Sequence, residues 1–280
     1  MKCKVCTNTE FDIVIVANPQ NNTEEFTYYF CKNCDAGFLF DIDLDKLSSN
    51  YNDEYDEYQD TEKSNSTLNK ILDYFYSPRD TYVLRNANKF DSILDIGCGN
   101  GSFLKTVRNT FKVLYGSEYN KLALNKAKKD LNNFHTVSED LKDFEILVDV
   151  ISMWHVLEHI PNPIEFLKKI KNLMKANSVL ILEVPNSYSL NFRIFTRNYK
   201  WISVPEHVFF YNEKSLITLL NYSGFEIVRT EFPRMFPLLF SKHFNSGILK
   251  LLLSPFSIII FILSPFFKST ESIRMVCKIK

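Results

Sequence analysis

The chain has 280 residues, which is long enough for one large domain with a small appendage and for a substantial core. Lysine plus arginine and aspartate plus glutamate both number 33, so the formal net charge is zero, which argues against a general nucleic-acid-binding protein. Hydrophobic residues make up 45% and charged residues 24%, which excludes a disordered chain or a coiled coil as the overall structure.

The first forty residues form a candidate metal-binding segment. Two C-x-x-C pairs, Cys3 with Cys6 and Cys31 with Cys34, can deliver four thiolates to one tetrahedral centre. The residues between them predict short strands at 11–16 and 26–30, as in a zinc ribbon. The N-terminus has no apolar leader, so we expect a reducing cytoplasmic location, where paired cysteines favour structural zinc over a disulfide. Reduced core thiols or a redox pair are the alternatives.

The rest of the chain divides into a polar linker with a helical lead-in at 41–90 and a main domain at 91–280. Short apolar runs alternate there with amphipathic stretches, which predicts a parallel sheet covered by helices. We expect strands at 92–96, 112–116, 148–153, 179–184, 225–230 and 272–280, and helices at 102–110, 164–174 and 213–222.

A glycine-rich turn follows the first of these strands. Gly97, Gly99 and Gly101 are three of only seven glycines in the chain, and strand, glycine loop and helix together are typical of a nucleotide-binding unit. Position 102 is Ser, so the dinucleotide fingerprint is incomplete. Asp95 would repel a pyrophosphate but suits the ammonium and sulfonium groups of S-adenosylmethionine. A nicotinamide or flavin nucleotide, or a turn that binds nothing, are the alternatives.

Four segments together resemble the class I S-adenosylmethionine-dependent methyltransferases. They read ILDIGCGNGSFL (93–104), GSEYN (116–120), SEDL (138–141) and DVISMWHVLEHIPNP (149–163). The resemblance implies a Rossmann-like seven-stranded sheet with one antiparallel strand, helices on both faces, and ligands at the carboxyl ends of the parallel strands.

The resemblance also implies a set of cofactor contacts. Asp95 and the loop after it would hold the methionine part, Glu118 the ribose hydroxyls, and the residues near Asp140 the adenine amino group. The full set of expected cofactor-binding residues is Asp95, Gly97, Cys98, Gly99, Gly101, Glu118, Tyr119, Asp140, Leu141 and Trp154.

A narrower resemblance concerns the acceptor. A four-cysteine segment, a Y-x-x-x-Y stretch (Tyr51, Tyr55) and a methyltransferase core together resemble bacterial methyltransferases of sugar and surface-polysaccharide biosynthesis. The acceptor this implies is a small molecule or glycan, nucleotide- or lipid-linked. In the related sugar C-methyltransferases a Glu-His pair supplies a base, and this chain has Glu206-His207. We expect 280 residues to be too few for the large C-terminal domain of those enzymes, so C- versus O-methylation stays open.

Three histidines are candidates for the base that takes the acceptor's proton: His155, His159 and His207. We expect His207, next to Glu206, to be the base and His159 to be a structural hydrogen-bonder, with His155 as a further catalytic candidate. The four-residue spacing of His155 and His159 can bind a metal in a helix, but we favour a packing role for that pair.

The segment 248–267 is strongly apolar and lies in an expected insertion at 232–271. Pro255 and Pro265 interrupt it, so a membrane-spanning helix is disfavoured. It predicts either short helices on the core or a peripheral contact with the inner face of the membrane. Methylation of a lipid or quinone-like acceptor there is one alternative function. An RNA methyltransferase and a non-catalytic binding module are two others.

Overall fold

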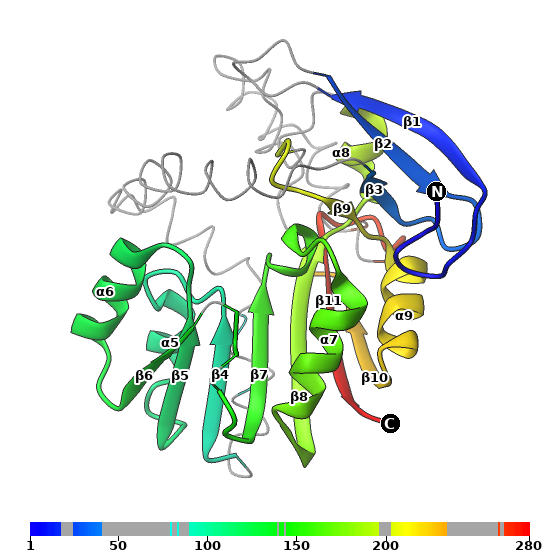
Figure 1. The fold of residues 1–280 in the computed structure, drawn as a ribbon. Coiled ribbons are helices and arrows are strands. Elements are labelled where there is room, and N and C mark those ends of the chain that lie inside the picture. The colour runs from blue at the N-terminus through cyan, green and yellow to red at the C-terminus, as the bar shows by residue number, and fades with distance from the viewer. Residues whose placement is uncertain are drawn as a thin grey trace.

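The structure is a computed structural model in which residues 1–17, 25–40, 79, 83, 90–138, 140–142, 144–195, 203–233, 263 and 266–280 are described (Figure 1). These residues form a seven-stranded sheet with helices packed against it and a four-stranded sheet that contains the N-terminal strands.

The large sheet has the strand order β10-β11-β8-β7-β4-β5-β6. β11 alone runs opposite to the other six strands of this sheet, which confirms the expected Rossmann-like sheet with one antiparallel strand. The bounds are β4 (Ser92–Ile96), β5 (Val113–Ser117), β6 (Phe134–Val137), β7 (Val148–Trp154), β8 (Met174–Pro185), β10 (Phe225–Glu231) and β11 (Ser272–Ile279). From β4 the chain proceeds outward to β5 and β6 and then crosses to β7, so the strand order reverses between β4 and β7, where α/β sheets bind ligands.

Helices cover both faces of this sheet, because alternate residues of its buried strands point to opposite sides. Ile93 and Val150 pack in one cluster with α5, whereas Leu94 and Ile151 pack in the other with α7 and α9. The helices are α5 (Ser102–Val107), α6 (Lys121–Asp130), α7 (Pro163–Asn172), α8 (Leu190–Phe195) and α9 (Glu213–Tyr222).

The four-stranded sheet has the order β1-β2-β3-β9 and joins the N-terminal segment to the main domain. Its first three strands are β1 (Phe11–Ala17), β2 (Phe26–Cys31) and β3 (Gly37–Leu39), and the fourth, β9 (Phe209–Phe210), comes from the main domain. Figure 1 shows this sheet above the carboxyl ends of β7 and β8. The Lys4 ammonium donates to the Pro161 carbonyl at 3.2 Å, and Lys214 pairs with Asp35 at 3.1 Å, so polar contacts add to the strand pairing.

Most predicted elements are present, with shifted ends. The expected helix at 213–222 coincides with α9, while β8 begins at Met174, five residues before the expected strand. The sequence reading did not identify α6, α8, β3, β6 or β9. His155 and His159 do not share a helix: the former has a φ of 57°, and the latter ends a short 3-10 turn, Leu157–His159.

The linker at 41–90 and the insertion at 232–271 lie mainly outside the described residues. The two tyrosines of the Y-x-x-x-Y stretch and most of segment 248–267 are among them. Across the helices that the structure does describe, none has both the length and the apolar character needed to cross a membrane.

Candidate active site

The glycine loop lies at the carboxyl end of β4, as its sequence predicts. Gly97 and Gly101 have φ values of 69° and 77°, in the left-handed region that favours glycine. A Cβ at Gly97 would lie 2.5 Å from Val156, and one at Gly101 would lie 2.8 Å from Leu131. A side chain at either position would clash, so the two glycines let the loop pack closely against Val156 and Leu131.

Asp95 lies beneath this loop with 1% of its surface exposed. Its carboxylate accepts a hydrogen bond from the Ser152 hydroxyl at 2.7 Å, because the two residues are register partners on β4 and β7. Burial raises the pKa of Asp95 to about 7, while the hydrogen bond from Ser152 and the charge of Arg79 oppose that rise. A buried carboxyl with this pKa gains most from a cationic ligand, which would stabilise its ionised form.

Glu118, directly after β5, connects the glycine loop to the next helix. One carboxylate oxygen accepts from the Gly99 amide at 2.8 Å, and the other accepts from the Asn120 amide at 2.9 Å. Asn120 in turn caps α6, accepting from the amides of Leu122 and Ala123. Each oxygen of Glu118 has a second lone pair, so the carboxylate can accept two further hydrogen bonds from a vicinal diol such as ribose.

Trp154, the last residue of β7, forms an aromatic wall beside the same loop. Its ring meets that of Phe103 edge-on, with 4.8 Å between centroids. The guanidinium groups of Arg79 and Arg274 lie 5.2 and 5.4 Å from the Trp154 ring centroid. Its buried indole N–H has no hydrogen-bond acceptor among the described residues, which is the kind of orphaned donor that a bound ligand satisfies.

A buried ion cluster that the sequence reading missed centres on Glu183 of β8. Arg274, its register partner on β11, donates to it at 2.7 and 2.9 Å, and Arg79 lies 3.7 Å away. Burial would raise the pKa of Glu183, but the hydrogen bond to His155 and the charges of Arg274 and Arg79 lower it well below its usual range. The sequence signal that could have revealed this cluster is one glutamate and one arginine, each within an otherwise apolar strand.

His155 lies between Glu183 and Glu158. Its Nε2 is 3.3 Å from Glu183 and its Nδ1 is 3.4 Å from Glu158. Burial would lower the pKa of His155, but the ion-pair contacts with the two carboxylates outweigh burial and raise that pKa to about 9. The imidazole is therefore protonated at neutral pH, which disfavours a base role at this position.

His207 and His159 lie side by side near Glu158. His159 and Glu158 belong to the turn that follows β7, and His207 belongs to the segment that leads into β9. Their ring centroids are 4.7 Å apart, and His159 Nδ1 donates to the Glu206 carbonyl at 2.8 Å. Glu206 itself accepts from the Ser203 hydroxyl at 3.1 Å. The structure thus brings together two of the predicted histidines and adds Glu158, while the base role of His207 and Glu206 stays a prediction.

The remaining predicted cofactor contacts lie on the rim. Tyr119 is 44% exposed, and Asp140 pairs with Lys142, whose hydrogen bond and charge lower the pKa of that carboxyl. Leu141 is buried with a φ of 57°. Cys98 is buried, and its sulfur would lie 2.8 Å from a Cβ at Gly116, so it packs against β5.

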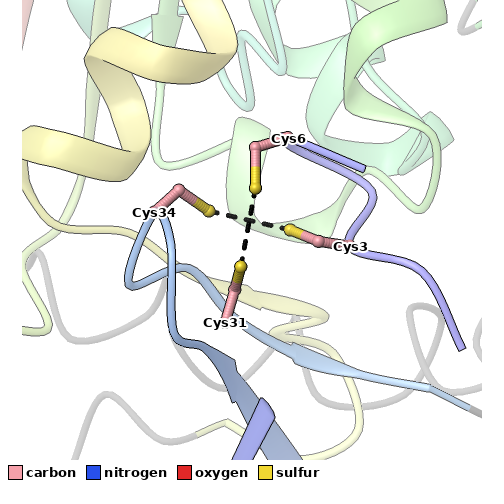
Figure 2. A group of neighbouring side chains, drawn as sticks. All are labelled: Cys3, Cys6, Cys31 and Cys34. Carbon is pink, nitrogen blue, oxygen red and sulfur yellow. Dashed lines mark hydrogen bonds between the residues drawn. The ribbon is translucent and has the colours of Figure 1, made fainter. Parts of the chain in front are cut away.

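The four N-terminal cysteines converge on one point (Figure 2). The Sγ atoms of Cys3 and Cys34 are 3.6 Å apart and those of Cys6 and Cys31 are 3.5 Å apart. Disulfides would need about 2.05 Å, whereas four thiolates around zinc with bonds of about 2.3 Å lie about 3.8 Å apart. The Val5 amide and the Asn8 side chain donate to two of the sulfurs, as outer partners of metal thiolates do.

Comparisons with known proteins agree with this geometry. A family described as "Methyltransferase domain" matches residues 59–230, more than half of the chain. A ubiquinone biosynthesis O-methyltransferase from Glaesserella parasuis serovar 5 (strain SH0165) is 30% identical over 106 residues, which cover 34% of this chain and 45% of that relative. The match therefore spans less than half of the relative's length.

Solved structures share the fold. A SAM-dependent methyltransferase from Archaeoglobus fulgidus has a TM-score of 0.55 at 22% identity, covering 81% of this chain and 100% of the other. Magnesium protoporphyrin IX methyltransferase from Synechocystis PCC 6803, with bound SAH, has a TM-score of 0.57 at 13% identity, covering 85% and 100%. The chain belongs to the family of methyltransferase domains.

Proposed function

We propose that this protein transfers the methyl group of S-adenosylmethionine to an acceptor oxygen, with a sugar of surface-polysaccharide or related biosynthesis as the acceptor. The observation that carries the cofactor assignment is the convergence of two buried carboxylates, Asp95 and Glu118, on one glycine loop at the carboxyl ends of β4 and β5. Such a site repels phosphates and suits a ligand with an ammonium group and a ribose diol.

The residues around the loop supply complementary groups for the cofactor. Asp95 pairs with the ammonium group, Glu118 accepts from the ribose hydroxyls, and Tyr119 covers the adenine. Arg79, half exposed and close enough to affect the pKa of Asp95, is the cation available for the methionine carboxylate. Trp154 closes the methionine side with its ring and its indole N–H.

Methyl transfer itself needs little covalent chemistry from the protein. The sulfonium carries a good leaving group, so holding donor and acceptor in line supplies most of the acceleration, with effective molarities up to about 10⁵–10⁸ M. The acceptor's proton leaves as its oxygen attacks. The sequence predicts that His207 accepts this proton. We propose that the cluster of Glu158, His159 and His207 takes part in this proton transfer.

The similarity to a ubiquinone biosynthesis O-methyltransferase supports oxygen methylation and keeps a second acceptor class in view. A lipid or quinone-like acceptor would be presented by a membrane surface. Phe266 and Phe267, at the end of the apolar segment 248–267, are 74% and 68% exposed, which favours such a contact.

We also propose that the four-cysteine cluster holds structural zinc. All four thiols are buried, and four sulfur ligands leave no open position for catalysis. The zinc would fix the turns that carry β1, β2 and β3, and so the small sheet that pairs with β9.

A labelled-methyl assay tests the proposed function. The purified chain is incubated with methyl-labelled S-adenosylmethionine and separate pools of nucleotide-linked sugars, lipid-linked glycans and reduced quinones, and the products are identified by mass spectrometry. Label in a sugar supports the proposal, whereas label confined to the quinone pool favours the second acceptor class. No label in any pool, together with no binding of S-adenosylhomocysteine, would contradict both.

A further inference from the structure

Glu158 is a buried carboxylate whose environment is incomplete. Only 1% of its surface is exposed, and neither of its oxygens accepts a hydrogen bond within the described part of the chain. His155 lies 3.4 Å from one carboxylate oxygen, and the charges of His159 and His207 also act on Glu158. Because the other oxygen of a buried carboxylate also needs a positive partner, this residue points to a missing cation.

Two imidazoles face that carboxylate. One ligand atom each from Glu158, His159 and His207 lies within 4.8 Å of the others. His159 Nδ1 is 2.8 Å from the Glu206 carbonyl, which can only accept, so Nδ1 carries the proton and Nε2 carries the lone pair. A histidine that donates one ring nitrogen to a carbonyl and offers the other is the usual arrangement of a metal ligand.

The backbone holds these three side chains in place. The Val208 amide donates to the Glu158 carbonyl at 2.9 Å, which ties the turn after β7 to the segment that leads into β9. The His207 carbonyl accepts from the buried Tyr28 hydroxyl at 2.7 Å. The three ligands therefore belong to two segments that are fixed to each other, and small side-chain movements suffice to bring them to coordination distance.

We propose that Glu158, His159 and His207 bind a divalent first-row transition cation, separate from the thiolate cluster. Two imidazoles and one carboxylate suit zinc, manganese, cobalt or iron, and three protein ligands leave positions for water or a substrate oxygen. The sequence reading disfavoured a metal at the pair His155 and His159. The structure assigns the second histidine to a different ligand set, with Glu158 and His207 in place of His155.

The use of this cation rests on the proposed function. An acceptor hydroxyl bound to it has a lowered pKa and releases its proton to water. The oxygen then attacks the methyl carbon, an O–C bond forms, and the C–S bond breaks to give S-adenosylhomocysteine. In this form His207 is a ligand, which replaces the base role predicted from the sequence.

Manganese binding tests the site, because this hard cation is a poor partner for the four thiolates. The purified chain is dialysed against citrate, its retained zinc is measured by elemental analysis, and Mn²⁺ is titrated while free Mn²⁺ is followed by electron paramagnetic resonance. We expect one Mn²⁺ site in the parent, at least tenfold weaker in Glu158→Gln and in His207→Ala. His135→Ala, an exposed histidine on β6, is the matched control and should bind as the parent does.

Binding of S-adenosylhomocysteine separates the two proposals and checks folding. Glu158→Gln should bind it as the parent does, and if that variant does not fold, His159→Gln carries the same test. Absence of stoichiometric Mn²⁺ binding in a parent that binds S-adenosylhomocysteine overturns the cation site alone. Unchanged Mn²⁺ affinity in Glu158→Gln also overturns it. A parent that binds Mn²⁺ but not S-adenosylhomocysteine supports the cation site and contradicts the proposed function.

Discussion

The hydroxyl of Tyr28 donates a 2.7 Å hydrogen bond to the backbone carbonyl of His207, 179 residues further along the chain. Leu39 adds a second link, because its amide donates to the Val208 carbonyl at 3.0 Å. The N-terminal sheet is thus attached to the segment that carries the predicted base. The cysteine cluster is therefore connected to this segment through β2, β3 and β9.

Removing the hydrogen bond from Tyr28 should affect methyl transfer more than cofactor binding. Tyr28→Phe leaves the His207 carbonyl without that donor, and a lost buried hydrogen bond costs about 1–3 kcal/mol. We expect a lower unfolding midpoint and slower methyl transfer, with the affinity for S-adenosylhomocysteine unchanged. Tyr222→Phe, on an exposed face of α9, is the control and should change neither property. Equal midpoints for the parent and Tyr28→Phe would contradict this link.

Loss of one cysteine should release the proposed zinc. We expect about one zinc per chain in the parent and none in Cys31→Ser, with unfolding of the N-terminal sheet, since metal binding is part of its folding free energy. Elemental analysis and thermal unfolding measure both effects. Cys277→Ala, at a buried thiol of β11 outside the cluster, should keep its zinc. Freshly purified parent protein without metal would contradict the assignment.

Cofactor binding should depend on pH through Asp95. Its pKa in the folded protein without cofactor is raised to about 7, from an ordinary value of 3.8, mainly by burial. The ammonium group needs the ionised carboxylate, so affinity should fall by up to about tenfold per pH unit as pH drops below about 7. Asp95→Asn should bind weakly at every pH, and Asp130→Asn, on the surface, should follow the parent. A flat pH profile in the parent would argue against this pairing.

The raised pKa of Asp95 affects the stability of the cofactor-free protein in the opposite direction: higher pH favours cofactor binding but lowers the free energy of unfolding. Between about pH 4 and pH 7 the folded protein keeps a proton on Asp95 that the unfolded chain has released. This contribution to the free energy of unfolding therefore declines as pH rises through that window. Denaturant unfolding of Asp95→Asn, compared with the parent at both ends of the window, isolates it, because the variant should lack this decline.

Breaking the buried pair of Glu183 and Arg274 should be costly. Arg274→Met leaves a buried carboxylate with weaker partners, and such a loss destabilises by about 3–5 kcal/mol. Urea unfolding measures the change. Lys112→Met removes an exposed partner of Asp91 and should leave the midpoint nearly unchanged. Similar midpoints for the two variants would show that the buried pair contributes no more than the exposed one.

The sequence was sufficient for the features that are local. The positions of Asp95, the glycines and Glu118 follow from one strand, one turn and the next strand, and the structure has them where they were expected. The pairing of Glu183 with Arg274 depends on the register of β8 with β11, 91 residues apart. The grouping of Glu158 with His207 depends on how two turns pack, and neither register nor packing can be read from spacing along the chain.

Calorimetric titration with S-adenosylhomocysteine tests the central claim most directly. The parent should bind one molecule per chain, and Glu118→Ala should bind about 10- to 150-fold more weakly, because it loses the charged acceptor for the ribose hydroxyls. Glu213→Ala, at the partly exposed start of α9, is the matched control and should bind as the parent does. No binding to the folded parent, or equal binding by Glu118→Ala, would contradict the account.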